Sequence, residues 1–303
     1  MRMHPAPGVV ILLLLLALPG MAQTVTFRFA PPDGTQYVEY TQQSITQQTG
    51  AGKAATETTW LKTRVQFRKT AYGYLMTCTP LWRKRVVNGA LQQSPSEVVW
   101  AQLVLTYDLD PAGTARTVHG YDAVPALVKA KFPAAVATKL LAGLNTTKIV
   151  EQQVAEWNQR VSEFKGKTAQ VGGGWTQQTS SPLPSGLTVP MTVHASFPAF
   201  ATRDGVHCMR VTLAQQGDPA TLTKAMNSAL RAHLPPAQAS KLPTVTSLAV
   251  SGTGERLIDP ATMLEHAYSA TRTTIMRLTP PTNGHLVVTT TEKRVTTYTY
   301  GKS

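Results

Sequence analysis

The chain has 303 residues, of which 42% are hydrophobic and 15% are charged, and its formal net charge is +13. The apolar content excludes a disordered or fibrous chain, because it is enough to build a packed core. The excess of Lys and Arg suits an anionic partner. These basic residues are scattered along the chain, however, and we expect no nucleic-acid partner.

The densest basic group is the run WRKR, in which Arg83, Lys84 and Arg85 form a candidate patch for an anionic ligand. The alternative is a solvated basic surface, because Lys and Arg side chains are mostly exposed in globular proteins.

The first 22 residues follow the order of a secretory signal peptide. A basic residue precedes an apolar run at residues 9–18, Pro19 ends that run, and the small residue Ala22 directly precedes Gln23. Ten apolar residues are too few to cross a bilayer, which needs about 20. We expect cleavage near Ala22, a mature chain with no transmembrane segment, and a periplasmic or secreted location.

Residues 23–122 are predicted to form an N-terminal β lobe. Apolar and polar residues alternate in several segments, from TVTFRFA at 24–30 to VVWAQLVLTYDLD at 98–110, as they do in strands with one buried face. The many threonines favour strands because a β-branched side chain fits a pleated surface. Asn88 and Gly89 predict a tight hairpin turn.

In residues 123–167 the apolar residues no longer alternate with polar ones but recur every three or four positions. This segment is therefore predicted to be helical. Upstream of a longer helix, one or two shorter helices broken at Pro133 are predicted from Val124, Val128, Val136, Leu140 and Leu144. One face of the longer helix is predicted from five apolar residues spaced four, three, four and three apart: Val150, Val154, Trp157, Val161 and Phe164.

Residues 168–303 are predicted to form a C-terminal β lobe with one short helix at about 218–234. Asp218 and Pro219 are typical of an N-cap and a first helical residue. The expected fold class is therefore α+β and rich in strand. It consists of two lobes of curved antiparallel sheet with the helical segment between them.

The two cysteines of the chain are Cys78 and Cys208. In an oxidising compartment a single pair of cysteines is more often bonded than free. We therefore predict a Cys78–Cys208 disulfide. The alternative is a pair of buried free thiols.

Four short segments carry a resemblance that covers most of residues 24–300: PPDGTQYVEYTQQ, YDLDPAGTARTVHGYDAVPALV, VGGGWTQQ and GTGERLIDPATMLEHAYSAT. In this order they resemble uncharacterised secreted or envelope-associated bacterial families built of antiparallel sheets with a helical insertion. The resemblance implies an exported protein that is not an enzyme, and it transfers no functional residues. The order of elements is also similar to the curved half-barrels of periplasmic lipoprotein carriers.

The motifs of catalysis and metal binding are weak in this sequence. The histidines are widely separated and lack a metal-ligand spacing. GAGKAAT at 50–56 lacks the first glycine and the Ser or Thr of a phosphate-binding loop. Asp108 and Asp110 resemble part of a calcium loop, but turn chemistry explains them better. We therefore expect no catalytic, cofactor or metal residues, and no enzymatic activity.

The remaining prediction is an exported, non-catalytic binding module. Its ligand would be a lipid or another amphiphilic or anionic component of the cell envelope, held on a concave apolar surface that the helical segment closes. The alternative is a structural or protein-interaction component of the envelope.

Overall fold

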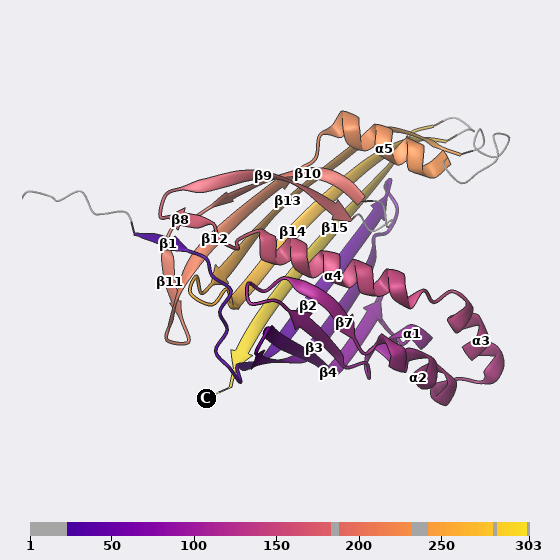
Figure 1. The fold of residues 1–303 in the computed structure, drawn as a ribbon. Coiled ribbons are helices and arrows are strands. Elements are labelled where there is room, and N and C mark those ends of the chain that lie inside the picture. Colours follow the sequence, from indigo (N-terminus) through magenta and orange to yellow (C-terminus); the bar gives the residue numbers. More distant parts are fainter. Residues whose placement is uncertain (1–22, 183–187, 232–241, 281–283, 302–303) are drawn as a thin grey trace, which may run out of the picture.

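A computed structural model describes residues 23–182, 188–231, 242–280 and 284–301 of the chain. The predicted signal peptide at 1–22 lies outside the described residues. Within them the protein is rich in antiparallel strand, as the sequence predicts, and the helices pack on the sheet (Figure 1).

Most strands of the described residues join one 13-stranded sheet. Its main path is β7-β6-β4-β3-β2-β15-β14-β13-β12-β10-β9, with β5 paired to β4 and β11 paired to β12, while β1 and β8 form a separate pair. The strands are β1 (Thr24–Thr26), β2 (Gln36–Thr49), β3 (Ala55–Thr70), β4 (Gly73–Val87), β5 (Ala90–Gln92), β6 (Leu105–Leu109), β7 (Ala115–His119), β8 (Thr168–Gln170), β9 (Gly174–Pro182), β10 (Thr188–Ser196), β11 (Phe200–Arg203), β12 (Val206–Gln216), β13 (Thr244–Ile258), β14 (Glu265–Thr279) and β15 (Leu286–Tyr300).

The helices are α1 (Pro95–Trp100), α2 (Val124–Lys131), α3 (Ala134–Ala142), α4 (Thr146–Ser162) and α5 (Pro219–Arg231), with a 3-10 turn at Tyr121–Ala123. Pro133 separates α2 from α3, as predicted. The side chain of Asn145 caps α4 by accepting a hydrogen bond from the Lys148 N–H at 3.0 Å. Asp218 caps α5 in the same way through the Thr221 N–H at 2.7 Å.

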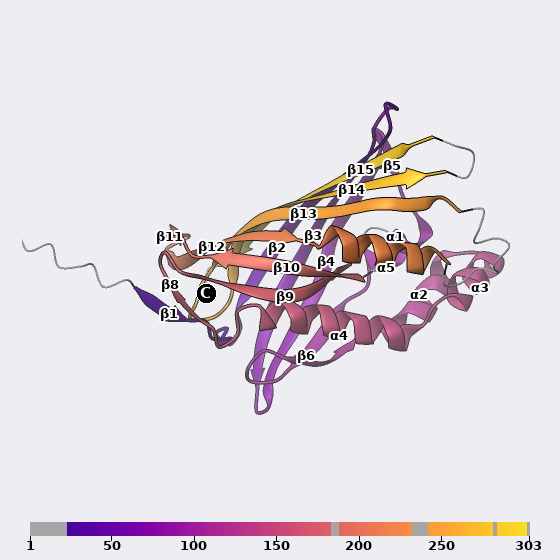
Figure 2. The same ribbon diagram turned by 90° about the horizontal axis from the view of Figure 1, so that it is seen from above.

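The sheet bends around α4. Asn158 bonds both backbone groups of Ala115 on edge strand β7, at 2.7 and 3.0 Å. The next residue, Gln159, donates to Thr179 and to the Ser180 carbonyl on the opposite edge strand, β9. Ten steps of about 4.8 Å separate these edges along a flat sheet, roughly 48 Å in all. Two neighbouring residues reach both edges only because the sheet curves. Helix α4 fills the gap between edge strands β7 and β9, which we call the seam (Figure 2).

Helices α4 and α5 pack on the same face of the sheet, which we call the inner face. On β14, Glu265 faces α4 and Leu278 packs in the cluster under α5. The strand register, followed through the bulge at His266, places both side chains on one face. The opposite face is the outer face.

Two features of the predicted fold need correction. The halves of the chain are not separate lobes with a helical segment between them, because β2 and β15 pair from Tyr37–Tyr300 to Thr49–Val288 and join both halves in one sheet. The segment 98–110, predicted as one strand, begins as helix α1 and becomes strand only at β6. Ser94 and Glu97 form a capping box that starts α1, and this sequence signal outweighs the alternation.

Among the described residues, no helix combines the length and the apolar character that a membrane span requires.

Candidate functional site

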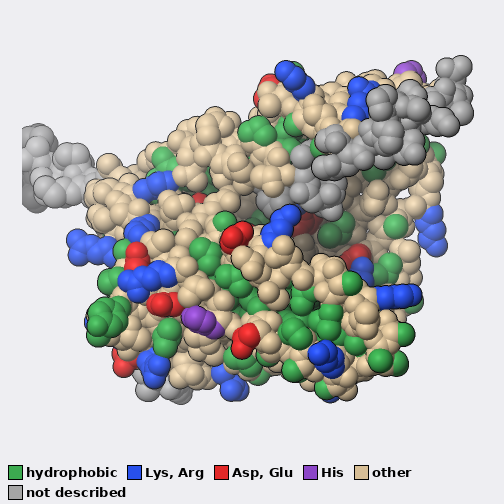
Figure 3. All heavy atoms as spheres, turned by 45° about the vertical axis from the view of Figure 1, so that its right-hand side comes forward, with side chains coloured by type: hydrophobic (Ala, Val, Ile, Leu, Met, Phe, Trp, Pro, Cys, Tyr) green, Lys and Arg blue, Asp and Glu red, His purple; other side chains and the backbone are tan. Residues whose placement is uncertain are grey.

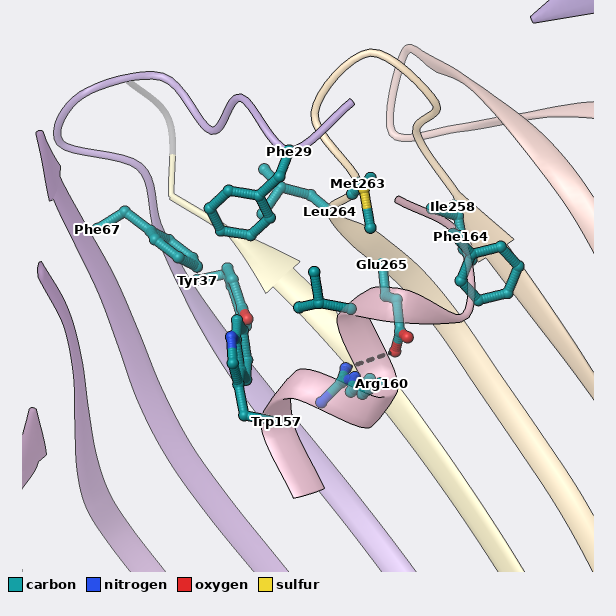
Figure 4. A pocket seen from close by; sticks show the side chains of 11 residues that line it. Phe29, Tyr37, Phe67, Trp157, Arg160, Phe164, Ile258, Met263, Leu264 and Glu265 are labelled. Carbon is teal, nitrogen blue, oxygen red and sulfur yellow. Dashed lines mark hydrogen bonds and ion pairs between the residues drawn. The ribbon is translucent and has the colours of Figure 1, made fainter. Parts of the chain in front are cut away.

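Beneath α4, a group of ionised side chains is enclosed at the inner face (Figure 4). Arg160 of α4 pairs with Glu265 of β14 at 2.8 Å, and the hydroxyl of Tyr298 donates to the same carboxylate. Arg256 of β13 lies 2.9 Å from Glu163 and 3.5 Å from Glu265. The Glu265 side chain is only 9% exposed, so it depends on these partners for its charge.

Glu265 is ionised at neutral pH. Burial alone would raise its pKa, but the positive charges of Arg160 and Arg256, with the hydrogen bond from Tyr298, outweigh burial and lower the pKa to about 2. The cavity beside this group has a volume of about 40 Å³, which is enough for about one water molecule. The ionised side chains therefore form a structural ion cluster. The cavity beside them is too small to hold a lipid.

Within the described residues, helices cover apolar parts of the predicted concave surface. The apolar part of the inner face near α4 is covered by side chains of the helical segment, and a second apolar cluster is covered by Leu222 and Met226 of α5. Between the helices the inner face is polar, because Arg272 pairs with Glu292 and Gln43 donates to the same carboxylate. In Figure 3 the surface is hollowed below α5, and acidic and basic side chains lie around this hollow.

The predicted basic patch is divided between the two faces of β4. Arg83 and Arg85 point to the inner face, where they meet Glu97 of α1. Lys84 lies between them in the strand and so points to the outer face, where its ammonium group sits 5.4 Å from the centre of the Trp60 ring. The three side chains therefore do not share one face of the strand, although all three line one pocket.

This pocket, the α1 pocket, has a volume of about 270 Å³ and lies among β4, β5 and α1. It opens where β4 has no strand partner on one side: β6 pairs with Tyr74–Cys78 and β5 pairs with Arg85–Val87, which leaves residues 79–84 unpaired there among the described strands. Its lining residues are Trp82, Arg83, Lys84, Arg85, Leu91, Gln92, Gln93, Glu97 and Ala101.

The two arginines of the α1 pocket differ in how fully they are bonded. Arg85 holds Glu57 through two hydrogen bonds of 2.8 Å, and this bidentate contact lowers the pKa of Glu57. Arg83 has one ion pair, to Glu97 at 3.6 Å, which is too long for a strong hydrogen bond. Its buried Nε atom has no hydrogen-bond partner in the described part of the chain. The guanidinium of Arg83 is therefore less fully bonded than that of Arg85.

The sequence analysis missed the two carboxylates that pair with the arginines of this pocket, Glu97 and Glu57. Glu97 could have been found, because Ser94-x-x-Glu97 is the sequence pattern of a capping box. Glu57 had no such signal. It meets Arg85 only because β3 and β4 pair in a register that brings both side chains to the inner face.

The structure contradicts the predicted disulfide. Cys78 on β4 and Cys208 on β12 are both free, and five strands of the sheet lie between β4 and β12. A disulfide requires Cα atoms within about 7 Å of each other. The alternative of two free thiols is the one that the fold adopts.

We expect two thiols per chain when the unreduced protein is denatured and treated with a thiol reagent. The native protein should react much more slowly, because burial raises the pKa of Cys78 to about 12 and that of Cys208 to about 11, and the thiolate is the reactive form. Ellman titration with and without denaturant checks this result. Fewer than two thiols in denaturant would show that a disulfide forms after all.

The remaining sequence candidates have structural explanations. Residues 50–54 form the turn between β2 and β3, and residues 55 and 56 begin β3. Asp110 accepts hydrogen bonds from the Ala112 and Thr114 N–H groups at 2.9 and 2.8 Å, which is the turn chemistry expected for it. The described residues contain no group of three His, Cys, Asp or Glu side chains placed to hold a metal ion.

Comparison with known proteins assigns no family to the chain. No protein-family model matches it, and no curated protein matches its sequence. A solved structure described as "Lipid-protein interactions in lipovitellin" is similar over 90% of this chain, with 7% sequence identity and a TM-score of 0.45. The similarity spans about a quarter of that much longer chain, 26%. A TM-score of this size does not establish a shared fold.

Proposed function

We propose that this protein is an exported, non-catalytic binding module for an anionic amphiphile, whose charged headgroup enters the α1 pocket. The observation that carries the proposal is the guanidinium of Arg83, which lines the pocket and whose Nε has no hydrogen-bond partner in the described chain. A phosphate or carboxylate group would accept from this guanidinium in the bidentate geometry that arginine favours.

The pocket combines this cation with apolar surface. Leu91 is 69% exposed and Trp82 is 44% exposed, and both line the same space as Arg83. An anionic headgroup attached to a short apolar chain therefore finds partners for both of its parts. The volume of about 270 Å³ lies just below the usual range for small-molecule sites, which begins at about 300 Å³, so a headgroup fits better than a whole lipid.

Two observations support a non-catalytic role. The most deeply buried carboxylate of the ion cluster, Glu265, has a pKa of about 2, too low for a proton donor or a base at neutral pH. The raised pKa values of Cys78 and Cys208 leave little thiolate for nucleophilic attack. The proposed export depends on the signal-peptide pattern of residues 1–22.

The test is a titration of the protein with dodecyl phosphate, kept below its critical micelle concentration, in which isothermal titration calorimetry measures binding. We expect binding to the native protein, a loss of affinity of tenfold or more in Arg83→Gln, and partial retention in Arg83→Lys, which keeps the charge but not the planar fork. Dodecyl maltoside, which has the same chain and no charge, should bind far more weakly.

The matched control is Arg203→Gln. Arg203 also has one ion pair, to Asp204 at 3.6 Å, but it lies on β11 outside the α1 pocket. This variant should bind dodecyl phosphate like the native protein. Equal affinity of Arg83→Gln and the native protein would contradict the proposed site.

A further inference from the structure

The charges of the central strands are separated between the two faces of the sheet. Strands β14, β15, β2 and β3 carry four carboxylates, and β4 carries none. The register places all four on the inner face: Glu265, Glu292, Glu39 and Glu57. Three of them have already been shown to pair with arginines of that face, and Glu39 lies 3.8 Å from Arg294. The outer face of these strands therefore has no carboxylate.

The outer face of the same strands carries only positive charge. The alternation of β3, β4 and β15 points five cations outward: Lys62, Arg64, Arg68, Lys84 and Lys293, all of which are exposed. With no acidic side chain among them, these cations produce a positive potential across the face.

Exposed apolar side chains lie among the cations. Tyr40, Lys62 and Trp82 are direct cross-strand neighbours on β2, β3 and β4, and Trp60 is the neighbour of Lys84. Tyr40 is 38% exposed and Trp82 is 44% exposed. On the β15 side, Val295 is 50% exposed, and its register partner Gln42 is also the partner of Trp60. We call the outer-face residues Tyr40, Trp60, Lys62, Trp82, Lys84, Lys293 and Val295 the outer patch.

We propose that the outer patch docks on an anionic lipid bilayer. Trp and Tyr side chains are enriched at the headgroup level of membranes, where an apolar ring and a polar edge are both satisfied. Lys and Arg near the surface are attracted to anionic lipids. Val295 favours a bilayer over a soluble polyanion, because an aliphatic side chain gains free energy at the boundary with the acyl chains and gains little on a hydrated polymer.

This contact goes beyond the proposed function, because it uses the face of the sheet opposite Arg83. Trp82 and Lys84 also line the α1 pocket, so the test leaves both unchanged. It uses Lys62, Lys293, Tyr40 and Val295, which do not line that pocket. Failure of the headgroup site and failure of bilayer docking are then separate results.

The experiment measures binding of the mature chain to vesicles by co-sedimentation and by quenching of tryptophan fluorescence with brominated lipids. We expect binding to vesicles of phosphatidylglycerol and phosphatidylcholine, and little binding to phosphatidylcholine alone. Lys62→Gln/Lys293→Gln should weaken binding by tenfold or more. Tyr40→Thr/Val295→Thr, which leaves the net charge unchanged and places a residue that favours strands at both positions, should also weaken it severalfold.

Two control variants test whether the position matters. Lys129→Gln/Lys131→Gln removes the same charge from exposed positions of α2, and Val104→Thr/Val136→Thr changes two apolar side chains that are 45% and 38% exposed elsewhere. Both should bind vesicles like the native protein. The proposal is overturned if the native protein does not bind the anionic vesicles, or if the control variants lose as much affinity as the outer-patch variants. It is also overturned if the native protein binds soluble polyphosphate as tightly as vesicles, without quenching by brominated lipid.

Discussion

Glu265→Gln is expected to lower the free energy of unfolding by about 3 kcal/mol. The substitution keeps the size of the side chain but removes the negative charge that Arg160 and Arg256 share. Arg256 is 11% exposed and retains Glu163 as a partner, whereas Arg160 loses its ion pair. The cost is the free energy of keeping a guanidinium beside a neutral amide in a partly dry environment.

The effect of Glu265 should depend on pH in a defined direction. The pKa of this carboxyl is lower in the folded protein, about 2, than in the unfolded chain, about 4.3. Its contribution to stability is therefore fully present above the unfolded value and is lost as the pH falls from about 4.3 toward 2. The difference between the native protein and Glu265→Gln should shrink over the same range.

Urea denaturation of both proteins at pH 7 and at several values down to pH 3 measures this effect. The matched control is Glu255→Gln, because Glu255 pairs with Arg210 at 3.5 Å but both side chains are more than 40% exposed. Exposed ion pairs contribute less than about 1 kcal/mol. A loss of stability in Glu265→Gln no larger than that in Glu255→Gln would contradict the structural role of the ion cluster.

Gly73→Ala is expected to cost more than about 3 kcal/mol and to disturb the pairing of β4 with β6. Gly73 begins β4 with a φ of +143°, and a Cβ atom added there would lie 2.0 Å from the carbonyl oxygen of Leu109 and 2.7 Å from the carbonyl carbon of Asp110. Both are backbone atoms, so no side chain can move aside. The strand end must shift, and Tyr74 and Met76 of the core move with it.

Gly34→Ala is the control that separates backbone strain from collision. Gly34 has a φ of +73°, but an added Cβ atom would meet nothing within 4 Å. Its cost should be the strain of the left-handed conformation, about 1 kcal/mol. Thermal and urea unfolding of the two variants measure the difference. Equal costs would show that the close approach of β4 to residues 109 and 110 does not constrain the fold.

The basic run WRKR shows where sequence reasoning succeeded and where it stopped. Its charge was readable, but the three cations were grouped as one patch, although the alternation of a strand places Lys84 on the face opposite its two neighbours. The sequence did not show that Arg85 is occupied by Glu57 while Arg83 is incompletely bonded. That difference depends on the register of β3 against β4 and on the position of α1.

The cysteines show a similar limit. Strand-like sequence surrounds both Cys78 and Cys208, and both do lie in strands. Their separation depends on strand order, because β2 and β3 from the first half and β13, β14 and β15 from the second lie between them. Local alternation carries no information on which strands become neighbours.

The sequence by itself determined the antiparallel strand content, the helices on either side of Pro133, the apolar face of α4 and the cap of α5. These features depend on residues within a few positions of one another, and local propensity, periodicity and capping account for them. Only the tertiary structure decided that both halves share one sheet, that Asn158 and Gln159 close its seam, and that every carboxylate of the central strands faces inward. Strand order and register arise from contacts between distant segments, and they assign each side chain its face and its partner.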